Sequence, residues 1–365
     1  MQLNHSRKQS QFAVISSKFK QTAKHPFFPI FVLGVFLILL QIVGSTGLIA
    51  PSVFNFLSPV IIRYIVALGF TLLLGYTGLA SLGTAGFMGL GSYLIGYLYK
   101  TVGMGSEIAF LIGIVVALVL GLFVGLVSLR VEGMYLAIVT LGLSEILKTF
   151  FLNSPLTGAA TGMQLAGIKF LGIFSAISLR YNSIYYLLIF VMVLCMVWVL
   201  NLINSPTGRA MLSIKNSTSA AQAMGISILK YRLTAFLIAT LFAVAAGMFQ
   251  MIRSNTVYPG TWGIDLSLNI LAAVVIGGTK NIWGVLLGTF LVFGLKDLVL
   301  ARIPFFQTYS NAYLMFTGVL IIVVVMFYPG GIAKLFSDLK RFIVKTASNI
   351  KTKYRNYKYG ENTEE

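Results

Sequence analysis

The chain has 365 residues and a net charge of +18; 58% of the residues are hydrophobic, only 10% are charged, and the mean hydropathy is +0.90. A soluble domain carries about a quarter charged residues, so this composition excludes an ordinary soluble protein. Apolar runs of about 20 residues recur without the alternation of a β-barrel. The sequence therefore predicts an all-α polytopic membrane protein.

We predict ten membrane segments, followed here in chain order. They lie near 27–43, 58–76, 83–100, 108–129, 133–152, 183–203, 231–252, 265–279, 282–301 and 311–328. The membrane domain then spans 27–329, between a basic cytoplasmic arm (1–26) and a basic cytoplasmic tail (330–365). With the N-terminus inside, most of the 27 Lys and Arg residues fall on the inner side, as the positive-inside rule requires.

The positive charge lies mainly in 1–26, 205–232 and 334–358, each beside an apolar run. This distribution also predicts attraction to anionic membrane lipid. No interleaving of basic and aromatic residues typical of a nucleic-acid fold occurs, so nucleic acid is not an expected partner. Cys195 is the one cysteine and both histidines lie in the N-terminal arm, so neither a disulfide nor a metal site is expected.

Two glycine-punctuated stretches mark the two halves of the chain: GYTGLASLGTAGFMGLGSY (75–93) and IGGTKNIWGVLLGTF (276–290). Five segments on either side of a long outer loop at 153–182 predict a 5+5 inverted repeat. The glycines either let helices approach closely or mark broken or re-entrant backbone near a substrate path. The segment at 265–279 is short enough to be a half-helix. The candidate path residues are Gly75, Gly78, Ser81, Gly83, Gly277 and Gly278.

Charged residues inside predicted segments are costly in lipid and are further candidates. Glu145 and Lys148 are three residues apart on one helix and can pair. Glu145 either lines a polar path or forms half of a structural pair inside the bundle. Arg63 and Lys296 are interpreted as structural groups.

The segment SPTGRAMLSIKNSTSAAQAMGISILKYR (205–232) separates two long apolar runs and has basic residues but no acidic one. Ser205 or Thr207 can cap a short helix, Ser219 and Gln222 have capping-box spacing, and Gly225 suits a C-terminal cap. A small helix rich in Ala and Met fits a groove on a partner protein. The alternative is a positive-inside loop with no partner.

Five collinear blocks within residues 60–335 resemble the permease subunits of branched-chain amino acid ABC importers, the LivM-type family. The blocks are GYTGLASLGTAGFMGLGSYL (75–94), YLAIVTLGLSEILKTFFLNSPLTGAATGM (135–163), SPTGRAMLSIKNSTSAAQAMGISILKYRLTAF (205–236), VIGGTKNIWGVLLG (275–288) and FYPGGI (327–332). The resemblance implies that about 205–230 is a coupling segment that docks on a separate ATPase subunit. The candidate coupling residues are Arg209, Lys215, Ala220, Ala221 and Gly225. Relatives commonly carry acidic residues where this chain has Asn216 to Ser219, so an ion pair to the ATPase is not expected there.

The resemblance further implies a homologous second permease, an extracellular or periplasmic substrate-binding protein and a bacterial cell membrane. No G-x-x-x-x-G-K-[ST] motif occurs, so ATP is expected on the ATPase subunit and no cofactor on this chain. No catalytic cluster occurs either, so the chain is expected to be a transport subunit and not an enzyme. The implied cargo is a branched-chain amino acid. Alternatives are urea or a short amide, a nucleoside or a sugar, or a self-contained secondary transporter, which has no need of an ATPase dock.

Overall fold

The computed structural model describes residues 27–45, 52–129, 134–170, 174–175 and 183–294, together with scattered positions between 315 and 341. The N-terminal arm, most of the predicted segment at 311–328 and most of the C-terminal tail lie outside the described residues. So do Lys296 and the neighbouring Asp297.

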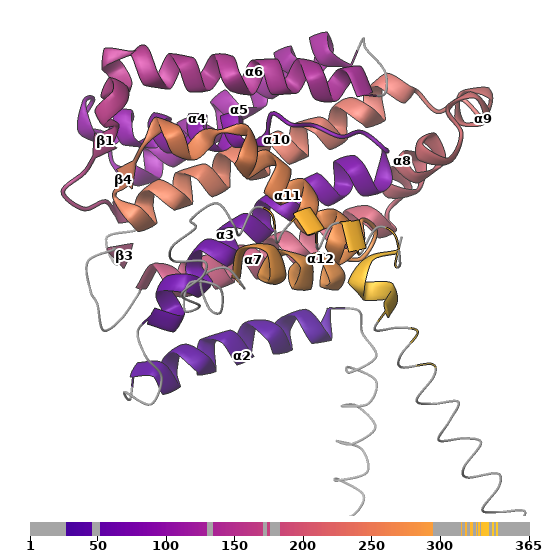
Figure 1. Ribbon diagram of the computed structural model, residues 1–365, viewed down its shortest axis with the longest axis horizontal. Helices are drawn as coiled ribbons and strands as arrows, with labels where there is room; N and C mark the ends of the chain where they lie inside the picture. The colour runs from indigo at the N-terminus through magenta and orange to yellow at the C-terminus, as the bar shows by residue number, and fades with distance from the viewer. Residues whose placement is uncertain are drawn as a thin grey trace, which may run out of the picture.

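The described chain is a bundle of helices (Figure 1). They are α2 (Phe28–Ser45), α3 (Ser52–Phe70), α4 (Thr84–Lys100), α5 (Ser106–Ser128), α6 (Met134–Asn153), α7 (Ser183–Asn204), α8 (Pro206–Asn216), α9 (Thr218–Ala223), α10 (Ile228–Ser254), α11 (Ile264–Gly277) and α12 (Ile282–Thr289). Two π-helical stretches, η1 (Thr71–Tyr76) and η5 (Phe290–Gly294), extend α3 and α12. Each predicted membrane segment up to residue 294 coincides with a helix.

Five of the described helical stretches are long and apolar enough to cross a membrane. They are Phe56–Tyr76, Ser106–Ser128, Tyr135–Asn153, Ile184–Asn204 and Ile228–Ser254. The chain is therefore a polytopic membrane protein of mainly helical structure. With 14 residues, α11 reaches about 21 Å at 1.5 Å per residue, short of a hydrocarbon core of about 30 Å. The helical part of this segment is therefore shorter than a full crossing, in agreement with the predicted half-helix or broken helix.

The core of the bundle is built around α3 and α10. In the most apolar 18 residues of each helix, 78% of the α3 residues and 72% of the α10 residues are buried, whereas in α5 and in α6 only 22% are buried. The helices α4 and α10 approach backbone to backbone: a Cβ atom on Gly91 would lie 2.9 Å from the carbonyl carbon of Val244, and one on Gly247 would lie 2.7 Å from that of Met88. Only glycine permits this approach, which is a common means of association between membrane helices.

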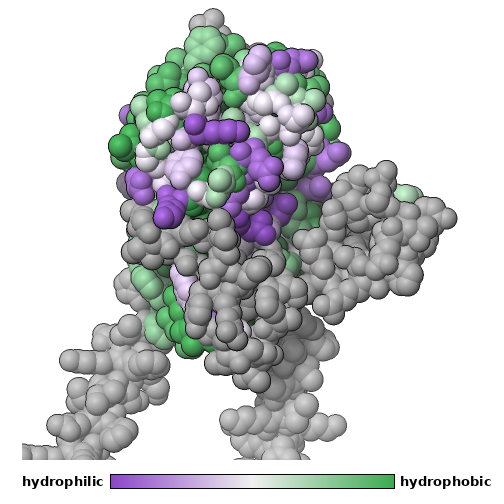
Figure 2. All heavy atoms as spheres, turned by 90° about the vertical axis from the view of Figure 1, so that its left-hand side faces the viewer, coloured by the Kyte–Doolittle hydropathy of each residue, from purple (hydrophilic) through white to green (hydrophobic). Residues whose placement is uncertain are grey.

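The two ends of the bundle differ from its sides. Short strands lie at one end, where β1 (Met163–Gln164) pairs antiparallel with β4 (Thr256–Val257), while α8 and α9 lie at the other (Figure 1). The strands β2 (Lys169–Phe170) and β3 (Phe174–Ser175) form a second short pair. Hydrophilic side chains gather at the strand end (Figure 2). Large apolar side chains are exposed along α5, α6 and α7. Polar ends and apolar sides suit helices that run across a membrane.

Candidate functional site

The first glycine-rich stretch breaks the helical path. After η1 the chain is non-helical from Thr77 to Gly83, and α4 begins at Thr84. Gly78 has a φ of +75°, the left-handed region that favours glycine. The amide of Leu79 then donates back to the carbonyl of Leu73 at 3.1 Å. The backbone is therefore broken between Thr77 and Gly83, whereas Gly91, later in the same stretch, serves close helix packing.

Hydroxyl groups from two other helices accept hydrogen bonds from the backbone amides around the start of α4. Thr140 and Ser144 of α6 accept hydrogen bonds from the amides of Leu82 and Gly86, both at 3.0 Å. Ser267 of α11 accepts from the amide of the intervening Ala85, also at 3.0 Å. The first amides of a helix have no partner within the helix, and the bilayer offers no water to replace one. Sequence analysis missed these three hydroxyls, although hydroxyl residues within apolar segments were visible.

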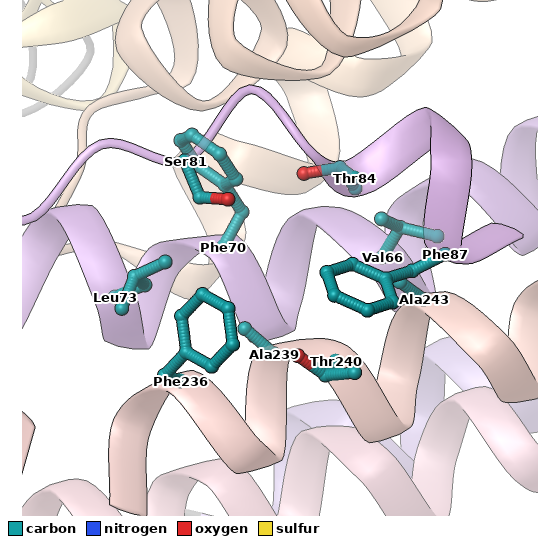
Figure 3. A pocket seen from close by; sticks show the side chains of 10 residues that line it. All are labelled: Val66, Phe70, Leu73, Ser81, Thr84, Phe87, Phe236, Ala239, Thr240 and Ala243. Atoms are coloured by element: carbon teal, nitrogen blue, oxygen red, sulfur yellow. The ribbon is translucent and has the colours of Figure 1, made fainter. Parts of the chain in front are cut away.

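A small cavity of about 10 Å³ lies between the broken stretch and α10. Its wall includes the hydroxyl residues Ser81, Thr84 and Thr240, and Figure 3 shows the hydroxyls of Ser81 and Thr84 turned toward each other. This volume is about the space of one water molecule. Two larger cavities, of about 540 and 400 Å³, have mainly apolar walls that include Phe190 and Trp198 of α7. Ser81 therefore lines a mainly apolar pocket with three hydroxyl residues in its wall, and this pocket is too small for an amino acid.

The two glycine-rich stretches meet at what we call the glycine junction, formed by Leu74 to Gly78 and Gly277 to Asn281. A Cβ atom on Gly75 would lie 3.0 Å from the carbonyl carbon of Thr279 and closer still to its oxygen. The Tyr76 hydroxyl donates to the carbonyl of Lys280 at 3.4 Å. Segments far apart in the sequence are therefore in direct backbone contact here.

The C-terminal FYPGGI block reaches the same junction. Gly278 has a φ of +103°, and a Cβ atom on it would lie 2.6 Å from the carbonyl oxygen of Gly330. Gly331 has a φ of +72°, and its Cβ atom would lie 2.5 Å from the Cα of Gly278. Gly277 ends α11 next to this turn. Three of the blocks that carry the family resemblance thus converge in space.

The segment between α7 and α10 folds as the two short helices α8 and α9. Ser205 caps α8, its Oγ accepting from the amide of Gly208 at 3.4 Å, which confirms one of the two predicted caps. The predicted capping box at Ser219 is wrong. The cap of α9 is Ser217, which has extended backbone and accepts from the amide of Ala220 at 3.2 Å, so that Ser219 falls inside the helix.

Gly225 follows α9 with a φ of +78°, as predicted for a C-terminal cap. The amide of Ile226 donates to the carbonyl of Ala221 at 3.0 Å and completes this turn. Ala220 and Gly225 are exposed, but Ala221 is only 2% exposed. The methyl group of Ala221 therefore packs against the protein itself, and its predicted role in coupling stays a prediction. The most exposed apolar side chain of the segment is instead Met224, at 81%.

The two basic candidates of the segment point in different directions. Arg209 is exposed and donates from Nη1 to the carbonyl of Asn204 at 3.0 Å. Lys215 turns inward, and its Nζ donates to the carbonyls of Leu74 at 3.0 Å and Gly75 at 2.9 Å. Burial lowers the pKa of Lys215 below its ordinary value, and the nearby Lys280 adds to this effect. The ammonium of Lys215 therefore joins α8 to the glycine junction.

The predicted pair of Glu145 and Lys148 is confirmed, with 3.4 Å between Oε2 and Nζ. Its predicted place inside the bundle is not: the side chains are 42% and 35% exposed. The reason is the position of α6 at the periphery, where Thr140 and Ser144 use its inner face. The guanidinium of Arg63 lies 4.8 Å from the ring centre of Phe293, a cation–π contact that fits the predicted structural role.

Apolar helices around a broken segment, with polar ends, define an integral membrane protein. Comparison with known proteins agrees: the family model described as the permease component of the branched-chain amino acid transport system matches residues 52–325. This chain belongs to that family.

Three relatives are named as LivM permease proteins of branched-chain amino acid transport. The protein of Escherichia coli (strain K12) is 29% identical over 293 residues, which are 74% of this chain and 67% of the relative. That of Salmonella typhimurium is 26% identical over 355 residues, 88% of this chain and 82% of the relative. That of Methanocaldococcus jannaschii is 24% identical over 314 residues, 74% and 89% of the two chains. No solved structure shows a significant match.

Proposed function

We propose that this chain is the membrane-spanning subunit of an ATP-binding cassette importer for branched-chain or related amino acids. The observation that carries the proposal is the α8–α9 segment. It holds the glycine junction through Lys215 on one side and exposes Met224 on the other. A separate ATPase subunit docks on this segment and supplies ATP hydrolysis, and no cofactor is held by this chain. The names of the three relatives support the substrate class.

In this proposal the chain crosses a bacterial cell membrane in ten segments, arranged as a 5+5 inverted repeat with both termini cytoplasmic. The inner end is then the end that carries α8 and α9, and the strand end faces outward. The concentration of Lys and Arg beside the inner ends of the segments supports this orientation. The basic arm and tail attract anionic lipid at the inner surface.

A homologous second permease completes the translocation path. The cavity lined by Ser81, Thr84 and Thr240 holds about 10 Å³, too little for an amino acid. The apolar outer faces of α5 and α6 leave ample surface for a neighbouring subunit within the membrane. A substrate-binding protein delivers the amino acid at the outer end, where the short strands lie.

Co-purification tests the docking of the ATPase subunit. Met224→Arg places a large charged side chain at the most exposed apolar position of the segment and should sharply reduce the ATPase subunit recovered with the permease. Leu156→Arg is the matched control. Leu156 is also exposed, at 56%, but it lies in the 3₁₀ turn Pro155–Thr157, which follows the C-terminal end of α6 at the strand end of the bundle. Equal recovery of the ATPase subunit with both variants would contradict docking at α8–α9.

Uptake assays test the substrate class. Proteoliposomes that contain the complete importer and its binding protein should accumulate labelled leucine, isoleucine or valine when ATP is supplied inside. Urea, a nucleoside and ribose serve as competing solutes in the same assay. Preferential uptake of one of these competitors would overturn the amino acid assignment and leave the ATP-driven mechanism standing. Uptake without any ATP would favour a self-contained carrier.

A further inference from the structure

We propose that Lys215 is the positioning residue that transmits movement of the α8–α9 segment to the glycine junction, by holding two backbone carbonyls of the broken helix. The proposal rests on the proposed function, because it presumes that an ATPase subunit moves this segment. Lys215 thus acts between the dock and the membrane domain and does not itself contact the ATPase.

The first step is the direct link between α8 and η1. The carbonyl of Leu73 already accepts from the amides of Thr77 and Leu79. The next two carbonyls along the chain, those of Leu74 and Gly75, accept from Lys215 Nζ at 3.0 and 2.9 Å. The last carbonyls of a helix lack partners within it and carry partial negative charge. An ammonium with three donors can hold both of them, and such charge-assisted bonds are stronger than neutral ones.

The second step is the position of Lys215 within its own segment. It is the penultimate residue of α8, and the chain bends at Ser217 before α9 begins. Its aliphatic stem also packs at the turn, since its Cγ lies 3.4 Å from where a Cβ atom of Gly78 would be. When α9 rotates about this bend, the end of α8 that carries Lys215 therefore moves with it. The Lys215 side chain then moves the turn at Gly78, against which it packs.

The third step carries the movement into the second half of the chain. Gly75 lies directly against the backbone of Thr279, and no side chain separates them. The adjacent Tyr76 is joined to the carbonyl of Lys280 at 3.4 Å. Closely packed atoms transmit a displacement instead of absorbing it. A pull on Gly75 therefore shifts the turn that joins α11 to α12.

The test uses the complete importer in proteoliposomes and measures three quantities: ATPase subunit retained, ATP hydrolysed, and substrate taken up. Lys215→Met keeps the length of the side chain and removes every donor. Loss of one hydrogen bond to a charged group corresponds to roughly a tenfold change in an equilibrium, so uptake per ATP hydrolysed should fall about tenfold or more. ATPase retention should stay normal. Lys215→Arg, which keeps the charge and several donors, should restore most of the coupling.

Lys100→Met is the matched control. It removes the same charge from an exposed lysine at the end of α4, outside the α8–α9 segment, whose Nζ also donates to a backbone carbonyl, that of Gln164, and it should keep the uptake per ATP of the unmodified chain. Tyr76→Phe provides an independent variant with minimal change in shape. It removes only the hydroxyl that bonds to Lys280 and should lower uptake per ATP in the same direction as Lys215→Met.

Two results would overturn the proposal. Normal uptake per ATP in Lys215→Met would show that the link transmits nothing. Loss of the ATPase subunit from Lys215→Met would show that Lys215 is a docking residue. Both outcomes leave the proposed function intact as long as the unmodified chain shows ATP-driven uptake. Absence of ATP-driven uptake in the unmodified importer would instead refute the proposed function itself, and this proposal with it.

Discussion

Gly75→Ala is the sharpest test of the glycine junction, because Gly75 has a helical backbone that alanine adopts without strain. The substitution therefore acts through steric contact alone. The new Cβ atom would lie 3.0 Å from the carbonyl carbon of Thr279, where ordinary van der Waals contact begins at 3.4 Å, and closer still to the carbonyl oxygen. The obstacle is backbone and cannot rotate away as a side chain can. The two halves of the junction must separate.

Overpacking of this kind destabilises a core by about 1 to 3 kcal/mol, and we expect a value near 3 kcal/mol because backbone must move. Thermal unfolding of the detergent-purified chain, followed by tryptophan fluorescence, measures the change in stability. Uptake in proteoliposomes measures the effect on transport. Both should fall.

Gly142→Ala is the control. Gly142 lies within α6, and a Cβ atom there would have no neighbour within 4 Å. Alanine is more favourable than glycine in a helix by about 1 kcal/mol, so this variant should be as stable as the unmodified chain or slightly more so.

Gly78→Ala should lower stability for a different reason. It has room, but its φ of +75° imposes about 1 to 2 kcal/mol of backbone strain on alanine. If Gly75→Ala behaves like Gly142→Ala, the close contact at the junction is refuted.

Three further predictions concern the periphery of the molecule. Glu145→Ala should lower the yield of folded chain, because Lys148 then stays in a membrane helix without its partner, where an unpaired charge is costly; an unchanged yield and elution volume on size-exclusion chromatography would contradict this. Cysteines placed at the exposed Ser217 and Thr161 should react with impermeant reagents from opposite sides of the membrane, and labelling of both from outside would refute the orientation. Gly225→Val should reduce ATPase retention without loss of the folded permease, because a β-branched residue resists a φ of +78°; normal retention would show that this turn does not orient the docking surface.

Hydropathy and charge were sufficient to predict the membrane helices and a polytopic membrane protein, whereas the permease family was predicted from the resemblance of five sequence blocks. Within a bilayer each backbone amide and carbonyl must be paired inside the protein, so a long apolar run has few structures open to it other than a helix. Local chemistry also predicted the cap at Ser205 and the left-handed turn at Gly225, because both depend on a few neighbouring residues. The glycines at 75–83 were identified as candidates for broken backbone for the same reason.

Only the tertiary structure decided which surface each candidate faces. Ala221 and Met224 are three residues apart and would share a face of a continuous helix. Instead α9 ends at Ala223, so Ala221 packs inward while Met224 is exposed in the turn that follows. Successive residues on a helix differ in direction by about 100°, which places Glu145 on the outer side of α6, while Ser144 reaches the start of α4. The contact of Lys215 with Gly75 spans 140 residues of sequence and leaves no local pattern. Such contacts depend on how the whole bundle packs, which no short stretch of the chain encodes.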